Sequence, residues 1–215
     1  MSRPKSGRPR DAASLLVTRD RGAASRVLLG RREPSDRFLP DMYVFPGGRV
    51  DRADAIRAAR SELREEVAAR VEARASRARA RALAVACVRE THEETGLAIG
   101  ELAGETLRPA LRDLEYVGRA ITPPRNPIRY HARFFHTELS PQIEVSLASN
   151  GELLDLEWHA FDAALELPML DVTAFLLRVV ARRVGHPAGD DPEVVPGPKT
   201  PFIHYRGEVR VISYE

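Results

Sequence analysis

The stretch that decides the fold is Arg89-Glu90-Thr91-His92-Glu93-Glu94-Thr95-Gly96-Leu97, which places three carboxylates on a segment typical of a helix that ends at a glycine. At helical spacing, Glu90, Glu93 and Glu94 fall at positions i, i+3 and i+4 and therefore share one face. Like charges at this spacing repel one another, so a helix that carries them indicates a compensating cation. Carboxylate oxygens are hard ligands that suit Mg²⁺ or Mn²⁺ better than zinc. A solvated acidic face is the alternative that this stretch alone leaves open.

A diglycine lies upstream, at the end of the apolar run Val44-Phe45-Pro46-Gly47-Gly48. Glycine lets a strand turn sharply and bring its backbone carbonyls close to a ligand. Together with Arg89-Glu90-x-x-Glu93-Glu94-x-Gly96-Leu97, it resembles the two ends of the Nudix box, the signature G-x5-E-x7-R-E-U-x-E-E-x-G-U of the Nudix hydrolases, where U is apolar. Every fixed position of the second half matches, and only Thr91 at the first U is atypical.

The first half of the box departs from this signature. The box separates its first glycine from its arginine by 14 positions, whereas Gly48 and Arg89 lie 41 positions apart. The early glutamate has no clear equivalent, because counting forward from the glycine gives Asp54 and counting back from the arginine gives Arg81. We therefore expect an insert at about 53–81, as in the Nudix subgroup that resembles the peroxisomal coenzyme A diphosphatases. Its Ala-, Arg- and Glu-rich sequence without Gly or Pro predicts one long helix or two.

Length and composition indicate one globular enzyme. A chain of 215 residues is long for a minimal domain and short for two, and 43% hydrophobic residues support a substantial core. No apolar run reaches the roughly 18 residues of a membrane span, and the N-terminus lacks the apolar segment of a secretory signal. The single Cys87 cannot form an internal disulfide. These features predict a cytoplasmic protein without a membrane partner.

The expected organisation is a flexible basic arm at 1–10 followed by a single Nudix hydrolase domain at 11–215, with a C-terminal extension at about 186–215. The net charge is only +2, and lysine occurs only at Lys5 and Lys199. Such an arginine bias reflects coding composition more than phosphate recognition, so a nucleic-acid partner is disfavoured. A homodimer remains open.

The expected fold class is α/β, a Nudix-type α/β/α sandwich with a mixed sheet and a helical insert within the box. Apolar alternation between turn signals predicts strands at 12–18, 26–30, 42–45, 114–121, 130–138, 153–161 and 209–214, a helix at 172–184, and a linker at 186–201.

The resemblance also implies roles for the residues of the box. Glu93 and Glu94 are implied as direct ligands of Mg²⁺ or Mn²⁺. Glu90 is implied either as a third ligand or as the group that orients and deprotonates the attacking water. Arg89 is implied as the catalytic-site partner that holds a motif glutamate through an ion pair, with Glu93 at i+4 as the candidate. Gly48 is expected to offer its backbone carbonyl to the metal.

Two further functions require residues outside the box. Some relatives use an additional base there, and Glu138, Glu144 and Glu152 are the candidates, among which the sequence does not choose. The substrate's phosphates need cationic donors. Arg125 and Arg129 flank a proline-rich loop, and a rigid loop presents a guanidinium with little entropy to lose.

The resemblance implies hydrolysis of the pyrophosphate in a small nucleoside diphosphate derivative. Coenzyme A hydrolases of the family carry the signature L-L-T-x-R-S-x3-R-x3-G-x3-F-P-G-G, of which Leu28, Leu29, Arg32 and Arg37 match here. Arg32 and Arg37 are therefore candidate substrate-binding residues, with coenzyme A or an acyl-CoA as the candidate substrate. ADP-ribose, nucleotide sugars and dinucleotides remain alternatives. A Nudix-like module that binds a nucleotide without cleaving it is the non-enzymatic alternative.

Overall fold

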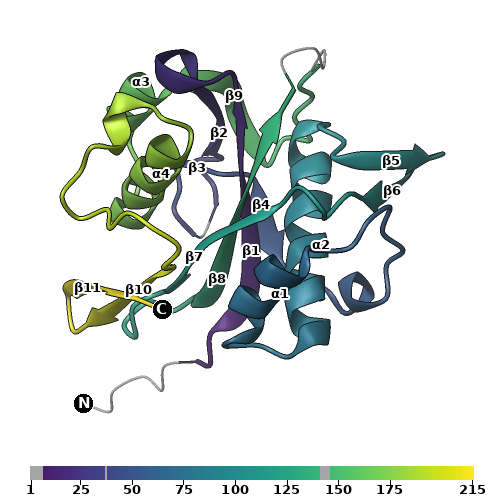
Figure 1. Cartoon of the computed structure of the whole chain (residues 1–215), viewed down its shortest axis with the longest axis horizontal. Helices are drawn as coiled ribbons and strands as arrows, with labels where there is room; N and C mark the ends of the chain where they lie inside the picture. The colour runs from purple at the N-terminus through teal and green to yellow at the C-terminus, as the bar shows by residue number, and fades with distance from the viewer. Residues whose placement is uncertain (1–6, 37, 141–145) are drawn as a thin grey trace.

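A computed structural model describes residues 7–36, 38–140 and 146–215. The described chain forms a central sheet with helices on both faces (Figure 1). The strands are β1 (Arg10–Arg19), β2 (Arg26–Arg32), β3 (Tyr43–Val44), β4 (Gly47–Arg49), β5 (Gly100–Ala103), β6 (Thr106–Pro109), β7 (Glu115–Ile121), β8 (Tyr130–Leu139), β9 (Leu153–Ala160), β10 (Pro201–Arg206) and β11 (Val209–Tyr214). The helices are α1 (Glu65–Glu72), α2 (Arg77–Thr95), α3 (Phe161–Leu165) and α4 (Asp171–Arg183).

The sheet is mixed, as expected. Its order is β11-β10-β7-β8-β1-β2-β3, with β4 paired to β1 and β9 paired to β2. The β1–β8 and β7–β10 pairs are parallel, whereas β1–β2, β7–β8 and β10–β11 are antiparallel. Strands β5 and β6 form a separate hairpin beyond α2 (Figure 1). Among the helices of the described part, none combines the length and the apolar character that crossing a membrane requires.

The side chains of the central strands alternate between two apolar cores. Leu15 and Val17 of β1 belong to the core under α1 and α2, whereas Leu16 belongs to the core under α4. Leu28 and Leu29 of β2 divide in the same way. Since successive residues of a strand point to opposite faces, one strand can fill both cores. The α/β/α sandwich predicted from the sequence is confirmed.

Helix α2 carries the acidic motif into the structure. Ser76 caps its N-terminus by accepting a hydrogen bond from the backbone N–H of Arg79 at 3.3 Å. Gly96 ends it with φ of 73°, a left-handed conformation that favours glycine. Thr91, atypical for an apolar position, is buried and donates its hydroxyl hydrogen bond to the Cys87 carbonyl at 2.7 Å. Satisfying that hydroxyl within the helix lets threonine occupy a core position.

The predicted strands and the predicted helix at 172–184 are present, with ends that shift by up to two residues. Five elements were not predicted: β4, β5, β6, α3 and β10. The expected linker at 186–201 contains the 3₁₀ turn Pro187–Gly189 and leads directly into β10, which pairs with β7. The C-terminal extension is therefore part of the sheet. The expected arm at 1–10 lies mostly outside the described residues, and Arg10 is already the first residue of β1.

The insert is helical over only part of 53–81. It contains the 3₁₀ turn Arg52–Ala55, an irregular stretch at 56–64, helix α1, and the first residues of α2. The prediction of one long helix is therefore wrong. Ser61 ties the irregular stretch to the core, because its hydroxyl accepts a hydrogen bond from the backbone N–H of Leu111 at 3.1 Å.

Helix α1 packs into the core. Val67 is 1% exposed there, whereas Ile56 in the irregular stretch is 86% exposed. We expect Val67→Ala to lower the free energy of unfolding by roughly 2 kcal/mol, through lost burial and the cavity left behind. Ile56→Ala, an apolar truncation in the same insert, should change it by about 0.5 kcal/mol or less. Urea unfolding measures both, and equal effects would show that α1 does not unfold with the core.

Candidate active site

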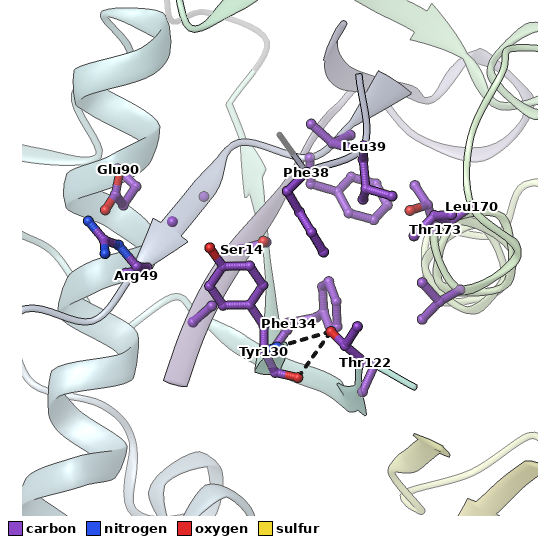
Figure 2. Close-up of a pocket in the computed structure, with 18 of the residues that line it drawn as sticks. Ser14, Phe38, Leu39, Arg49, Glu90, Thr122, Tyr130, Phe134, Leu170 and Thr173 are labelled. Atoms are coloured by element: carbon purple, nitrogen blue, oxygen red, sulfur yellow. Dashed lines mark hydrogen bonds between the residues drawn. The ribbon is translucent and has the colours of Figure 1, made fainter. Parts of the chain in front are cut away.

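A cavity of about 570 Å³ opens where the diglycine strand β4 meets α2. Glu90, Glu93 and Glu94 of α2 line one end, together with Glu152 from the loop before β9. Residues of the β7–β8 connection and of the start of α4 line the other end (Figure 2). The structure therefore brings the two halves of the motif together in one cavity, although 41 positions separate Gly48 from Arg89.

The diglycine allows α2 to lie against β4. A Cβ atom at Gly48 would lie 2.3 Å from the carboxyl carbon of Glu90, and one at Gly47 would lie 2.5 Å from the Ala13 carbonyl oxygen. The backbone N–H of Gly47 also donates a hydrogen bond to Glu94 Oε2 at 2.8 Å. Gly47, with φ of 152°, meets backbone atoms and must be glycine, whereas a side chain at Gly48 would displace the carboxylate of Glu90.

Arg89 is the buried hub of the acidic cluster. Its Nε and Nη2 donate hydrogen bonds to the two carboxylate oxygens of Asp54 at 2.9 and 3.1 Å. Its Nη1 lies 2.8 Å from a carboxylate oxygen of Glu93 and 3.0 Å from one of Glu90. The ion pair expected between Arg89 and Glu93 is therefore present. The guanidinium orients three carboxylates at once, as its planar set of donors allows.

Asp54 resolves the question of the missing early glutamate. Its side chain is 1% exposed and also accepts a hydrogen bond from the backbone N–H of Asp51 at 2.8 Å. The alternative from backward counting, Arg81, instead pairs with Glu62 at 2.9 Å near the surface. Of the two candidates, the residue reached by counting forward from the glycine is therefore the one that contacts Arg89.

Burial raises the pKa of two glutamates in the acidic cluster. Desolvation raises the pKa of Glu94 to about 8, and the Gly47 N–H offsets only part of this. Desolvation also raises the pKa of Glu90 above its usual value, against the opposing effect of Arg89. A divalent cation would stabilise both ionised carboxylates, and all the donors are hard oxygens, so this set fits Mg²⁺ or Mn²⁺.

The candidate metal ligands each have another contact among the described residues. Within the described residues, no group of three or more carboxylate, histidine or cysteine side chains is positioned to hold an ion. Arg89 holds Glu93, and Gly47 holds Glu94. Ion binding would therefore require rotation of a glutamate side chain, for which the half-exposed Glu93 has room.

Of the two candidate bases outside the box that the structure describes, one lines the cavity and the other does not. Glu152 lines the cavity near Glu90 and Glu94. Glu138 instead forms an ion pair with Arg21 at 2.7 Å, away from the cavity lining. Glu144 lies outside the described residues. Glu152 is therefore the candidate that the structure brings to the site.

The expected phosphate-binding arginines are corrected by the structure. Arg125 does not line the cavity; it is 66% exposed and pairs with Glu208 at 2.6 Å. Arg129 also points elsewhere, because its Nε donates to the carbonyl of Thr122 at 3.1 Å. Neighbours of both arginines in the same loop line the cavity, so the loop reaches the cavity and the two guanidinium groups do not.

The structure describes only one of the two candidate arginines of the coenzyme A signature. Arg32 lines the cavity and pairs with Asp36. Its Nε is buried and has no hydrogen-bonding partner in the described part of the chain. Arg37 lies outside the described residues.

Arg49 directly follows the diglycine and was not predicted as a site residue from the sequence. It is exposed at the cavity beside Glu90 (Figure 2), and its guanidinium has no ion-pair or hydrogen-bonding partner among the described residues. Arg32 and Arg89, the other cations of the cavity lining, are both paired with carboxylates. The position next to Gly48 is a signal that could have identified Arg49.

One family model matches part of the chain. The NUDIX domain model matches residues 8–82, a match that spans the expected insert and ends before the acidic motif. This part of the chain is therefore similar to a Nudix domain.

Solved structures of similar fold agree with this. The crystal structure of a NUDIX hydrolase from Alicyclobacillus acidocaldarius has a TM-score of 0.61 and 29% sequence identity, covering 81% of this chain and 92% of that chain. The NUDIX domain of Shewanella oneidensis NrtR complexed with ADP ribose has a TM-score of 0.52 and 14% identity, covering 82% and 89%. A C. elegans Ap4A hydrolase binary complex has a TM-score of 0.51 and 14% identity, covering 81% and 96%. No curated protein is similar enough in sequence to match the chain.

The last two likenesses concern the fold alone. The domain match and the likeness to the Alicyclobacillus hydrolase support a pyrophosphohydrolase. Nudix hydrolases generally use divalent metal ions such as Mg²⁺, which agrees with the oxygen donors of the acidic cluster.

Proposed function

We propose that this protein is a Mg²⁺- or Mn²⁺-dependent hydrolase that cleaves the pyrophosphate of a nucleoside diphosphate linked to another group. The observation that carries this proposal is the division of the cavity. Glu90 and the unpaired Arg49 lie on one side of the cavity, and the uncharged Leu39, Leu170 and Thr173 lie on the other (Figure 2). Glu93, Glu94 and Glu152 also line the cavity. A substrate with phosphates at one end and an uncharged organic group at the other matches that division.

In this proposal, Glu90, Glu93 and Glu94 hold the cation, together with the carbonyl of Gly48. When bound, the ion neutralises charge on the phosphate oxygens and lowers the pKa of the attacking water. Arg89 keeps Glu93 and Glu90 oriented through its ion pairs. The proton of the water passes to a carboxylate of the same cavity, for which Glu90 and Glu152 are the candidates.

Two proteins of similar fold act on or bind nucleotide derivatives. The C. elegans structure is that of an Ap4A hydrolase, and the Shewanella domain binds ADP ribose. Dinucleotides and ADP-ribose are therefore reasonable members of a substrate panel, beside nucleotide sugars and coenzyme A.

The test is to incubate the protein with Mg²⁺ and this panel and to follow the release of nucleoside monophosphate, or of adenosine 3′,5′-bisphosphate from coenzyme A. Turnover of one or more compounds supports the proposal. Binding without turnover would instead identify a nucleotide-binding module that does not catalyse.

Coenzyme A is the second candidate substrate, and one observation favours it. Arg32, which matches the coenzyme A signature, lies in the cavity and keeps a buried Nε without a partner in the described part of the chain. Coenzyme A and its 3′-dephospho form separate this candidate from the others. If Arg32 binds the 3′-phosphate, Arg32→Ala should raise KM for coenzyme A and leave that for the dephospho form unchanged. Equal changes would place Arg32 on the shared pyrophosphate or in the scaffold.

Arg49 is proposed to bind the phosphates of the substrate. We expect Arg49→Ala to raise KM about tenfold or more with little change in kcat, because a charge-assisted hydrogen bond contributes about 1.5–3 kcal/mol. Arg52→Ala is the matched control, since Arg52 is also exposed and follows on the same segment but does not line the cavity. Equal behaviour of the two variants would remove Arg49 from the binding site.

A further inference from the structure

A second cavity, of about 190 Å³, lies at the C-terminal end of α4. Figure 1 shows the segment 190–200 running from this end of the helix to β10. Arg182 and Arg183 of α4 line the second cavity. Val172 and Thr173, at the start of the same helix, line the cavity of the acidic cluster instead. The two cavities have no lining residue in common, so the second one is separate from the candidate active site.

Three cations and no carboxylate line the second cavity. They are Arg182, Arg183 and Lys199. Lys199 is exposed, and its ammonium has no ion-pair or hydrogen-bonding partner among the described residues. Arg183 Nη1 donates to the Tyr116 carbonyl at 3.1 Å, and Arg182 Nη1 donates to that of Gly189 at 3.0 Å. Because carbonyl oxygens are uncharged, these contacts place no anion beside either guanidinium.

The carboxylates nearest to this cavity in sequence are bound elsewhere. Glu193 does not line the cavity and pairs with Arg210 at 2.6 Å. Glu215 does not line it either, and pairs with Arg119 at 2.6 Å. The C-terminal end of α4 contributes only about half of one negative charge, which is small against three cations. The cavity therefore carries a positive charge that the described side chains around it do not neutralise.

The segment that carries Lys199 is held in place by Tyr214 of β11. The Tyr214 hydroxyl accepts a hydrogen bond from the backbone N–H of Val195 at 3.1 Å and donates one to the Glu193 carbonyl at 2.6 Å. Tyr214 and Val195 also line the cavity. A cation on a segment that is already ordered loses less entropy when it binds a ligand. This end of the molecule is therefore organised to receive an anion.

From these observations we propose that the second cavity binds a phosphate group, which belongs either to inorganic phosphate or to a small phosphate ester. Arg182 and Arg183 offer planar sets of N–H donors that match phosphate oxygens, and Lys199 adds a point charge. A phosphate group carries up to about two negative charges near pH 7, so it offsets more of the three cations than a carboxylate does. Pockets for drug-sized ligands measure about 300–1,000 Å³. A cavity of about 190 Å³ fits a small anion better than a whole nucleotide.

The test titrates the full chain with inorganic phosphate at constant ionic strength, with a chelator in place of divalent ions. Backbone amide signals of Val195 and Gly197 in NMR spectra report binding at this cavity, and both should shift until saturation. Lys199→Gln should weaken phosphate binding about tenfold or more, since it removes a charge-assisted contact, and Lys199→Arg should retain the binding. Arg206→Gln is the matched control, because Arg206 is exposed at the other end of β10 and lines neither cavity.

Phenyl phosphate and acetate distinguish the possible ligands. Tighter binding of phenyl phosphate than of inorganic phosphate would identify a phosphate ester whose organic group packs against Val179 and Val194 of the lining. Equal or weaker binding would identify inorganic phosphate as the ligand. Acetate that binds as tightly as phosphate would overturn the inference, because the cations would then not select a phosphate group. So would an absence of saturable shifts at Val195 and Gly197, or an equal loss of affinity in Lys199→Gln and Arg206→Gln.

Discussion

Replacing Glu94 with glutamine is expected to lower kcat by a factor on the order of one hundred or more while the fold is retained. The amide keeps the size of the side chain and can still accept the hydrogen bond of the Gly47 N–H. It removes the negative charge that would bind the cation, and the charge stabilisation lost is several kcal/mol, where each 1.4 kcal/mol is a factor of ten. Glu93→Gln should act in the same way.

The readouts are steady-state kinetics with Mg²⁺ and thermal unfolding without it. Unfolding should show no loss of stability for Glu94→Gln, because glutamine removes a buried carboxylate whose pKa burial raises. Glu65→Gln is the control, since Glu65 of α1 is 72% exposed and pairs with Arg77 at the surface. Hydrolysis that continues undiminished after thorough chelation would contradict both the metal dependence and this role of Glu94.

The sandwich could be predicted because its signals are local. Strands β1 and β2 contain short continuous apolar runs, and Gly96 marks the end of α2. The glutamates of α2 share a face for the same reason, since helical spacing alone fixes it. Strand β10 could not be predicted this way, because its partner β7 lies far away in sequence and only tertiary pairing identifies it as a strand.

The arginines show where prediction from sequence failed. A guanidinium at the end of a long side chain can reach several partners, and the choice depends on which acids the fold brings nearby. Arg125 meets Glu208 from the distant C-terminal hairpin, so its loop faces the cavity and its charge does not. Arg49 lines the cavity without an ion-pair partner among the described residues, whereas Glu93 and Glu94 bind Arg89 and Gly47. Neither outcome is encoded in local spacing.

Asp54 was undecided in the sequence for a related reason. Two ways of counting gave Asp54 and Arg81, and the insert made both consistent with the motif. The deciding quantity is burial: the Asp54 side chain is 1% exposed against the Arg89 guanidinium, whereas Glu62, the partner of Arg81, is 60% exposed. An ion pair removed from water must be well matched in geometry, and a surface pair need not be.

We expect Asp54→Asn to lower the free energy of unfolding by about 3 kcal/mol, since breaking a buried ion pair leaves the remaining charge uncompensated. Arg89 would keep Glu90 and Glu93 but lose the bidentate contact that holds its plane. Because Asp54 acts on the reaction only through Arg89, kcat should fall by about 10- to 100-fold, as for other residues that orient metal ligands. Urea unfolding and steady-state kinetics measure the two effects.

Glu62→Gln is the matched control, because it makes the same acid-to-amide change in the ion pair with Arg81. At a surface pair the expected loss is about 1 kcal/mol or less, with kcat unchanged. Asp54→Glu separates positioning from packing: if the longer acid restores the contact with Arg89, kcat should recover together with stability. Similar small losses for Asp54→Asn and Glu62→Gln would mean that Arg89 is held by Glu90 and Glu93 alone. A large loss of stability without any loss of kcat would make Asp54 a purely structural residue.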